Sequence, residues 1–590
     1  MTLIWLNIAK TNYCKLLLFI LAKMYFMRLI LFFITFYCAA FAQVNYPKDY
    51  FRPPLDIPMQ LSGNFGELRP NHFHAGFDFK TLQREGLQVY AVADGYVSRI
   101  KISTFGNGKT IYITHSNGYT SVYGHLQKAT DSIEIYIKKA HYSDQSFEIE
   151  RYLKPGELVV KKGQIIGLSG NTGASEGPHL HFEFRDNITE NIINPMLFGF
   201  DQFLKDTKKP IIYNLYAYPL DNESVVNQSK RPLLLNLNLQ KDGTYLADKV
   251  VANGRIGFGI NTFDYDDVSF NRNGVYKVQT FYNGTPNFGY QFDTYSFDEM
   301  RYVNALIDYS MYKKTQQRVQ KLFMKDPYNL SIIKAGTNNG VVNLLPNLSA
   351  QYRIEVSDFF GNLTSISIPI VNEILPVVVV NVPVSKYLVK AKNESNFSKE
   401  NMSVFFPANT FYEDFNLNFD VKNDTLLLHS DIVPAHSNFT IEIVDQKFSD
   451  SQRDKLYVAS INRNKLGYNR TYRKDSIFTT YVKTLGKYAL VLDNIPPKIS
   501  IAKSIEGKWL SDKKFIQFII SDDLSGIKSY NGYLNGKWIL FEYDNKTKKI
   551  THNFSDGIVA EGANDLKIIV EDNLGNSTIF ETRFFRSQKN

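Results

Sequence analysis

Cysteine is almost absent from this sequence of 590 residues: it occurs only at Cys14 and Cys38, both within the first 42 positions. A chain that begins beyond that point has no disulfide bond to rely on. It also has no thiolate to serve as a metal ligand or as a nucleophile. Metal chemistry, if present, is therefore left to imidazole and carboxylate groups.

Long stretches with the 3.6-residue period of an amphipathic helix are also scarce. The sequence is instead rich in asparagine and β-branched residues, with 37 tyrosines and 44 phenylalanines. This composition favours strands, so we predict a mostly β protein. The chain is too long for one hydrophobic core, and roughly 100–200 residues per domain suggests three to five domains.

Concentrated positive charge is lacking beyond the first segment. The formal net charge is +9, but residues 1–42 hold four lysines or arginines and no acidic residue. The mild excess that remains suits either an anionic polymer or an ordinary solvated surface. There is no basic helix and no alternation of aromatic and basic residues, so we expect no nucleic-acid partner.

The first 42 residues have the features of an export signal. Arg28 precedes the apolar run Leu29–Cys38, and Ala40-Phe41-Ala42 fits the small-x-small pattern of a cleavage site. We therefore expect a signal peptide over residues 1–42 and a mature chain that starts near Gln43.

Two alternatives remain for this leader. Met24 or Met27 would be a more usual first residue, and in that case the first two dozen residues are a start-site artefact. The segment Leu16–Ala42 is also long and apolar enough to suggest a retained anchor, the only membrane contact we expect. Lys23 and Arg28 divide it into two short runs, which favours cleavage.

Composition and turn residues divide the rest of the chain. Residues 43–57 form a proline-containing lead-in, and 58–200 contain short alternating runs separated by glycines, typical of antiparallel sheet. Within the insertion at 128–156, Ile133, Ile135 and Ile137 alternate as in a strand, and the polar stretch that follows is helix or loop.

Two later segments resemble each other, and we interpret them as copies of one β-sandwich at 206–372 and 493–588. Three pieces match. They are an aspartate four residues before a proline (Asp206 and Asp493), a paired-aspartate turn (Asp266-Asp267 and Asp522-Asp523), and an aspartate followed three residues later by Gly-Asn (Asp358 and Asp572). The first copy is longer and is predicted to hold a short helix at 297–310, with Ser296 and Glu299 in capping-box spacing. Between the copies, 373–490 is another β-rich unit that begins with the apolar strand Val377–Val380.

Histidine is strongly clustered, because seven of the ten histidines fall between His72 and His181. His179, His181 and Glu183 alternate on one predicted strand and therefore share one of its faces. Two imidazoles on a rigid strand are typical of part of a metal site, which needs at least one further ligand. The best upstream donors are His74 and Asp78, four residues apart.

Residues 58–200 resemble the LytM/lysostaphin-type family of zinc metalloendopeptidases, which cut peptidoglycan. The resemblance is carried by four segments: His74-Ala75-Gly76-Phe77-Asp78, Ile113–Tyr119, Tyr123-Gly124-His125-Leu126, and Gly170–Gly173 followed by Gly177–Glu183. It implies one Zn²⁺ held by His74, Asp78 and His181, with His125 and His179 assisting catalysis. Three protein ligands leave a fourth position open, as in catalytic zinc sites.

The remaining candidates are expected to have structural roles. His115 lies in a turn, His72 lines a groove or is merely exposed, and His141 falls in the insertion. The paired aspartates at 266–267 and 522–523 could suggest calcium, but such pairs at a sandwich turn are usually turn chemistry.

Two functions follow as hypotheses. The first is an exported zinc endopeptidase of the periplasm or cell envelope that cleaves stem peptides or cross-links of peptidoglycan, with the sandwiches contacting envelope partners. Cross-links that contain D-amino acids are favoured over glycine bridges, because no recognisable basic wall-targeting module follows. The second is a non-cleaving envelope protein that binds peptidoglycan or regulates another hydrolase, with 128–156 as a lid over the groove.

Overall fold

The computed structural model describes residues 23, 45–334, 336–373, 385 and 387–587. The predicted leader over 1–42, apart from Lys23, and the predicted strand Val377–Val380 lie outside the described residues. The chain divides into two compact units, Met1–Lys48 and Asp49–Asn590, and the second contains all the elements below. Among the described residues, no helix combines the length and the apolar character needed to cross a membrane.

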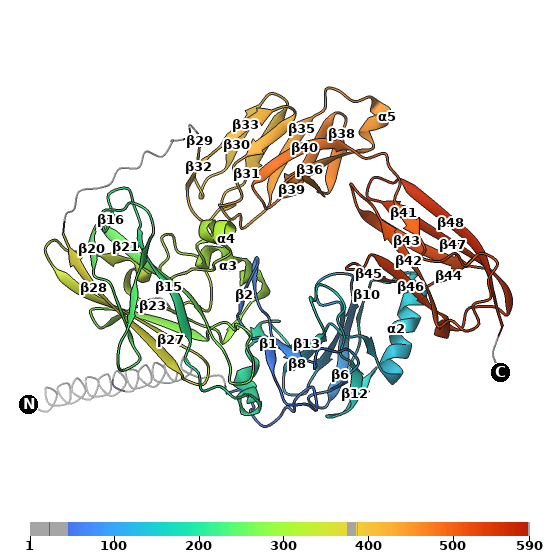
Figure 1. Cartoon of the computed structure of the whole chain (residues 1–590), viewed down its shortest axis with the longest axis horizontal. Coiled ribbons are helices and arrows are strands. Elements are labelled where there is room, and N and C mark those ends of the chain that lie inside the picture. Colours follow the sequence, from blue (N-terminus) through green and yellow to red (C-terminus); the bar gives the residue numbers. More distant parts are fainter. Residues whose placement is uncertain (1–22, 24–44, 335, 374–384, 386, 588–590) are drawn as a thin grey trace, which may run out of the picture. The chain divides into compact units, whose positions relative to one another are not determined.

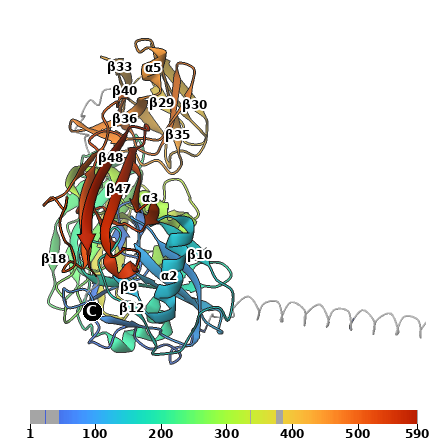
Figure 2. The same cartoon turned by 90° about the vertical axis from the view of Figure 1, so that its right-hand side faces the viewer.

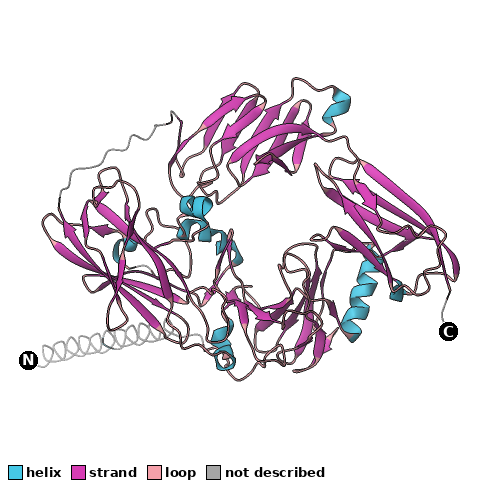
Figure 3. Ribbon diagram, in the orientation of Figure 1, coloured by secondary structure: helices cyan, strands magenta, loops and turns pink. Residues whose placement is uncertain are grey.

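Strands dominate the described chain, and the helices are few and short (Figure 3). The prediction of a mostly β protein is confirmed. Starting from the amino-terminal side, the strands form a first β domain and then three further β units, coloured from blue to red in Figure 1.

The first domain is built on an antiparallel sheet with the order β1-β4-β13-β8-β7-β6-β10. The strands and 3₁₀ helices of this domain are β1 (Leu61–Gly63), β2 (Leu68–Arg69), β3 (His72–Phe73), β4 (Phe77–Lys80), β5 (Gln88–Tyr90), β6 (Gly95–Ile102), β7 (Lys109–Thr114), β8 (Tyr119–Gly124), β9 (Lys128–Ala129), β10 (Ile149–Tyr152), β11 (Val159–Val160), β12 (Ile165–Leu168), β13 (His179–Asp186), β14 (Ile192–Ile193), η1 (Pro195–Phe198) and η2 (Phe200–Phe203).

Strand β13 lies between β4 and β8 and separates two environments. Leu180, Phe182 and Phe184 are fully buried on one face, where Phe182 stacks on Phe200 with ring centroids 5.5 Å apart. Because side chains alternate along a strand, the polar residues between them point to the other face. The aromatic core thus fixes the strand that carries the H-x-H pair.

The insertion contains the helix α2 (Asp131–Asp144) rather than a strand over its isoleucines. The strand interpretation of Ile133–Ile137 was therefore wrong. Ile133, Ile137, Ala140 and His141 are buried, which is helical spacing, whereas the side chain of Ile135 is 60% exposed. Over so short a run, three isoleucines at alternate positions are compatible with a strand and with a helix.

The second unit continues the sheet of the first. Its strand β24 (Thr294–Tyr295) pairs with β14, so the two units share backbone hydrogen bonds. Its other elements are β15 (Ile211–Pro219), β16 (Val225–Val226), β17 (Leu233–Leu235), β18 (Leu237–Leu239), β19 (Tyr245–Ala247), β20 (Val250–Asn253), β21 (Arg255–Phe263), β22 (Lys277–Tyr282), β23 (Thr285–Gln291), η3 (Phe297–Tyr302), α3 (Val303–Leu306), α4 (Tyr309–Thr315), β25 (Gln320–Lys321), η4 (Thr337–Gly340), β26 (Val342–Asn343), β27 (Ser349–Ser357) and β28 (Leu363–Asn372).

The helical insertion predicted at 297–310 is present as η3, α3 and the start of α4. Ser296 Oγ accepts a hydrogen bond from the amide of Asp298 at 3.3 Å. The predicted capping box does not form, because the Glu299 carboxylate instead accepts hydrogen bonds from the amide and hydroxyl of Ser331.

The third unit consists of two five-stranded sheets around one apolar core, together with a short strand pair. Its elements are β29 (Tyr387–Val389), β30 (Ser395–Lys399), β31 (Met402–Phe406), β32 (Phe415–Leu417), β33 (Phe419–Lys422), β34 (Thr425–Leu428), β35 (Phe439–Val444), α5 (Asp450–Arg453), β36 (Leu456–Asn462), β37 (Lys465–Tyr468), β38 (Thr471–Lys474), β39 (Ile477–Val482) and β40 (Gly486–Leu492).

The last unit is a sandwich of two four-stranded sheets, and its long strands β47 and β48 run side by side in Figure 2. Residues from both sheets form one core. Its elements are β41 (Lys498–Ser500), β42 (Phe515–Ser521), β43 (Ile527–Leu534), β44 (Lys537–Ile539), β45 (Glu542–Asp544), β46 (Lys549–Asn553), η5 (Phe554–Asp556), β47 (Gly562–Asp572) and β48 (Ser577–Arg586).

The second and last units repeat the same side-chain contacts. Asn362 donates from Nδ2 to the carboxylate of Asp358 and to the carbonyl of Asp206, and Asn576 makes the equivalent contacts. The equivalent acceptors in the last unit are Asp572 and Asp493. The internal repeat that we infer from the sequence thus has a counterpart in matched hydrogen bonds.

Candidate metal centre

The register of two neighbouring strands brings together the predicted ligands from β4 and β13. His181 lies directly opposite Asp78 in this antiparallel pair. Residues opposite each other across two strands project from the same face of the sheet. Both side chains therefore point away from the aromatic core and toward one point.

His74 reaches the same point from the turn that connects β3 to β4. The turn passes so close to β13 that a Cβ atom on Gly76 would lie 2.1 Å from the carbonyl oxygen of Phe182. Glycine is therefore required between His74 and Asp78, because any side chain would push this turn off the sheet.

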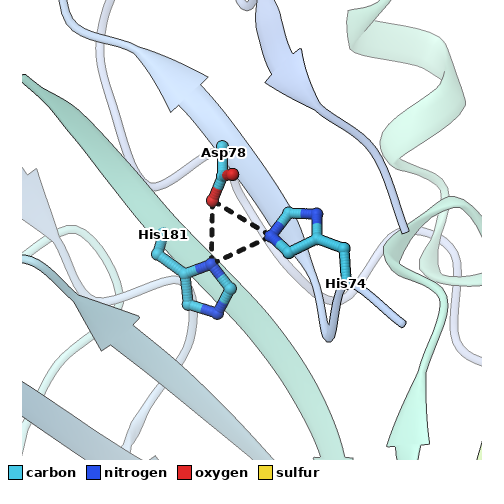
Figure 4. Close-up of side chains that lie close together, drawn as sticks. All are labelled: His74, Asp78 and His181. Carbon is cyan, nitrogen blue, oxygen red and sulfur yellow. Dashed lines mark hydrogen bonds and ion pairs between the residues drawn. The ribbon is translucent and has the colours of Figure 1, made fainter. Parts of the chain in front are cut away.

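The three side chains form a tight triangle of donor atoms (Figure 4). His74 Nε2 lies 3.1 Å from Asp78 Oδ1 and 3.2 Å from His181 Nδ1, and the remaining edge, from His181 Nδ1 to Asp78 Oδ1, is 2.8 Å. All three residues are buried, with exposed fractions of 2–5%.

A second contact fixes the orientation of each of these groups. His74 Nδ1 lies 2.7 Å from the carbonyl oxygen of Asn64, and Asp78 Oδ2 accepts a hydrogen bond from Arg69 Nη2 at 2.5 Å. His181 Nε2 lies 2.8 Å from Glu183 Oε1. Since carbonyl and carboxylate oxygens only accept, these outer ring nitrogens carry protons, which leaves His74 Nε2 and His181 Nδ1 as the atoms that would supply lone pairs to an ion in the triangle.

Glu183 is buried and does not face solvent; its side chain is 1% exposed. Arg185 donates to Glu183 Oε2 from Nε at 2.7 Å, so His181, Glu183 and Arg185 form a chain of hydrogen bonds along one face of β13. The sequence indicated Glu183 as a possible orienting group. It gave no comparable sign for Arg185, Arg69 or Asn64.

The two predicted catalytic histidines lie beside the triangle with one ring nitrogen each held by a carbonyl. His125 Nδ1 is 2.8 Å from the carbonyl of Thr172, and His179 Nδ1 is 2.8 Å from that of Gly177. The proton is therefore on Nδ1 of each ring, and Nε2 is left as the basic atom. The rings are 4.7 Å apart, and His179 Nε2 is 3.4 Å from Asp78 Oδ1.

His125 has a left-handed backbone with φ of 58°, which is uncommon for a residue with a side chain. Its amide donates to the carbonyl of Asn107 at 2.8 Å, and its ring is held by Thr172. These two contacts from separate loops hold the strained conformation in place, as is common for functional residues.

The charges of the site favour a cation at the triangle. Burial lowers the pKa of His74 to about 4. The pKa of His125 is lowered to about 3, mainly by burial and, to a smaller extent, by the charges of His181 and His179. Burial also acts to lower the pKa of His181, but its hydrogen bonds to Asp78 and Glu183 outweigh it and raise that pKa to about 9. The two carboxylates thus attract positive charge to the point between the ligands.

The other histidines of this domain lie apart from the triangle. His115 is buried, with its ring nitrogens 2.9 Å from the carbonyl of Asp94 and 2.8 Å from Ser121 Oγ, a bridge within the fold. His72 is exposed, and His141 is buried in α2. These positions agree with the structural roles expected for His115 and His141.

The donor set fits a catalytic zinc ion. Two neutral imidazoles and one carboxylate are zinc ligands, and tetrahedral zinc with bonds near 2.1 Å separates its donors by about 3.4 Å. The observed edges of 2.8–3.2 Å are close to that separation. His74, Asp78 and His181 would therefore hold the ion without rearrangement of the backbone.

Comparisons with known proteins agree with this site. The model of peptidase family M23 matches residues 72–142 and 135–195, and that of the Zu5-like domain matches 386–493. An uncharacterized metalloprotease of Haemophilus influenzae is 34% identical over 158 residues, which are 25% of this chain and 27% of that protein. The peptidoglycan DD-endopeptidase ShyC of Vibrio cholerae is 35% identical over 146 residues, 24% of this chain and 28% of that protein.

A solved structure also matches this region. The catalytic domain of the antimicrobial peptidase lysostaphin from Staphylococcus simulans is 29% identical, covering 23% of this chain and 87% of that domain with a TM-score of 0.18. The chain spans about a quarter of the length of the curated relatives it matches. Residues 72–195 of this chain form a domain of peptidase family M23, the LytM/lysostaphin-type metallopeptidases that the sequence motifs indicate.

Proposed function

We propose that this protein is an exported zinc endopeptidase that hydrolyses amide bonds in the stem peptides or cross-links of peptidoglycan. The observation that carries this proposal is the triangle of His74, Asp78 and His181, with edges of 2.8–3.2 Å and two further histidines beside it. A domain that only bound peptidoglycan would not need three potential metal ligands with two further histidines beside them.

Each side chain has a distinct task in the proposed reaction. A bound Zn²⁺ supplies a Lewis acid that polarises a peptide carbonyl and makes a water molecule more acidic. His125 and His179 both present an unprotonated Nε2, so either can take the proton of the attacking water. The imidazolium formed in this way then gives the proton to the leaving amine, and the other ring stabilises the developing oxyanion when its Nε2 carries a proton.

The supporting groups keep these atoms in place. Arg69 and Glu183 orient Asp78 and His181, and the carbonyls of Thr172 and Gly177 fix the tautomers of the two catalytic histidines. Because these contacts come from several loops and strands, the geometry does not depend on the substrate.

The bond we favour is an amide of a D-amino-acid cross-link. ShyC, named as a peptidoglycan DD-endopeptidase, is among the similar proteins. Glycine bridges are the alternative substrate.

The test combines zinc content with digestion of purified peptidoglycan by residues 43–590, and product masses identify the bond. We expect about one Zn²⁺ per chain and new cross-link fragments. His181→Ala should lose both, whereas His125→Ala and His179→Ala should retain zinc and lose cleavage. His72→Ala, a change at an exposed histidine two positions from a ligand, is the control and should retain both.

The same experiment addresses the non-cleaving alternative. The last β unit contacts the glycine-rich turn beside His179: Lys546 Nζ donates to the carbonyls of Asn171 and, at 3.0 Å, Ser175. Zinc without cleavage would favour restricted access to the groove, and removal of 128–156 or of the last unit would then be compared. If the protein shows no bound zinc and no cleavage, the enzyme proposal is contradicted.

A further inference from the structure

Three carboxylates from separate parts of the second β unit meet at one end of its sheets. Asp206 lies in the segment that enters the unit, Asp264 directly follows β21, and Asp358 directly follows β27. One carboxylate oxygen of each lies within 4.8 Å of the others. The side chains of Asp264 and Asp358 are buried, and that of Asp206 is half-buried.

An unpaired amide oxygen is aimed at the same point. Asn273 and Asp264 exchange both backbone hydrogen bonds at 2.9 Å, so they form a directly opposed pair whose side chains share one face. Asn273 is 6% exposed and Asp264 is 4% exposed. Oδ1 of each is buried without a hydrogen-bond partner.

These groups line a cavity of about 50 Å³. A buried acceptor without a donor loses its hydrogen bonds to water without replacement, so two such oxygens beside two further carboxylates are unfavourable unless something binds them. A water molecule could satisfy hydrogen bonds, but it would not balance the negative charge.

Lys205 lines the same cavity, but the carboxylates of this cluster are not neutralised by an ion pair in the part of the chain that the structure describes. In the described part of the chain, no lysine, arginine or histidine forms an ion pair with Asp206, Asp264 or Asp358, and Lys208 instead donates to the carbonyl of Asp266. Burial, followed by the charges of Asp206 and Asp358, raises the pKa of Asp264 to about 8.

We propose that Asp206, Asp264, Asp358 and Asn273 bind a hard divalent cation of the Ca²⁺ type. The donors are all oxygens, which suit Ca²⁺ or Mg²⁺ rather than Zn²⁺. Ca²⁺ accepts six to eight oxygens in flexible geometry, so backbone carbonyls and water complete the shell. The site is separate from the histidine-rich centre and has a different ligand chemistry.

A short chain of contacts connects the two sites. Gly274, next to the ligand Asn273, exchanges hydrogen bonds with the side chain of Asn64 at 2.7 and 2.8 Å. The carbonyl of Asn64 lies 2.7 Å from His74 Nδ1. A cation at the carboxylates would therefore lie beside the loop that holds the ring of a zinc ligand.

The last unit repeats the acidic cluster with Asp493, Asp522 and Asp572. There the carboxylates accept backbone amides, including Ser525 to Asp493 at 3.1 Å and Gly526 to Asp522 at 2.7 Å. The unpaired buried oxygen of this second cluster is the hydroxyl of Ser525, not an amide or carboxylate oxygen, and each of its three carboxylates accepts a hydrogen bond from a backbone amide. It provides a matched control rather than a second site.

The test is calcium binding by the full chain, with its zinc retained. Binding is measured by titration calorimetry and by the shift of the unfolding midpoint in CaCl₂. We expect saturable binding with a dissociation constant between about 10⁻⁷ and 10⁻³ M. Asp264→Asn and Asn273→Ala should each weaken it at least tenfold and remove the rise in unfolding midpoint, whereas Asp522→Asn should leave both unchanged.

Three outcomes would overturn the proposal. They are no saturable binding in the wild type, binding unchanged in both site variants, and binding lost only in Asp522→Asn. Asp206→Asn keeps the proposal testable if the buried variants fail to fold, because Asp206 is half-buried in the entering segment. MgCl₂ in place of CaCl₂ distinguishes the two cations, and an equal response to both would still support a hard divalent site.

Discussion

Arg69 Nη2 donates to Asp78 Oδ2 at 2.5 Å, and this contact turns the other carboxylate oxygen, Oδ1, toward His74 and His181. Arg69 also donates to Glu67 at 3.2 Å, which restricts the guanidinium itself. The aspartate of the metal centre is therefore oriented by a neighbour that no ligand motif includes.

Replacement of Arg69 should weaken zinc binding without unfolding the domain. Groups that orient a metal ligand typically contribute about 10–100-fold to metal affinity, so Arg69→Met should raise the zinc dissociation constant by that factor. Competition with a chromophoric chelator measures it. The control is Arg99→Met, since Arg99 also pairs with a carboxylate, Glu150, but on β6 and β10. Equal affinity in both variants would exclude the orienting role.

The buried Glu183–Arg185 pair should be costly to break on one side only. Glu183→Ala leaves the Arg185 guanidinium, whose side chain is 7% exposed, without its main partner. Removing one member of a buried pair costs about 3–5 kcal/mol of unfolding free energy, whereas loss of both members costs less. Urea unfolding of Glu183→Ala and of Glu183→Ala/Arg185→Met tests this. A double variant less stable than the single would contradict it.

Gly76→Ala should abolish zinc binding. The added methyl group would lie 2.1 Å from the carbonyl oxygen of Phe182, and a backbone atom in a central strand cannot give way cheaply. Zinc content after dialysis measures the loss. Gly177→Ala is the matched control, because a Cβ atom there meets nothing within 4 Å, and it should retain zinc. Normal zinc content in Gly76→Ala would mean that the turn is looser than the structure indicates.

Lys546→Ala should increase hydrogen exchange in the glycine-rich turn at 170–177. Lys546 contacts the carbonyls of Asn171 and Ser175, and hydrogen bonds from a charged donor contribute about 1.5–3 kcal/mol when they are protected from solvent. Because Lys546 is exposed, we expect the lower end of that range or less. Mass spectrometry of the peptide that covers 170–177 measures the change.

Lys548→Ala is the control for this experiment, since Lys548 is exposed on the same hairpin. If exchange in the turn is the same in both variants, Lys546 does not hold the turn in solution.

The centre of the site could be predicted from sequence because its geometry is local. Alternation along β13 places His179, His181 and Glu183 on one face, and four residues separate His74 from Asp78. The mostly β fold likewise follows from composition. The resemblance to the metallopeptidase family supplied the choice of His74, Asp78 and His181 as ligands and of His125 and His179 as assisting residues.

The supporting groups could not be predicted, because they are set by register and tertiary contact. Arg69 and Asn64 reach the ligands from a separate hairpin and loop, and neither has a distinctive neighbour in the sequence. The helix α2 was missed for another reason: Ile133, Ile135 and Ile137 fit two periods over five residues, and burial of Ala140 decides between them.

The pairing of β24 with β14 also has a consequence for how this protein can be divided. Tyr295 is buried in that pairing, and its hydroxyl donates to the carbonyl of His74 at 2.5 Å. A fragment that ends near residue 200 would uncover Ile192 and Ile193, an apolar strand with unsatisfied backbone groups, and such an edge is a template for self-association. The catalytic domain and the unit after it are thus expected to remain monomeric together and to aggregate when separated.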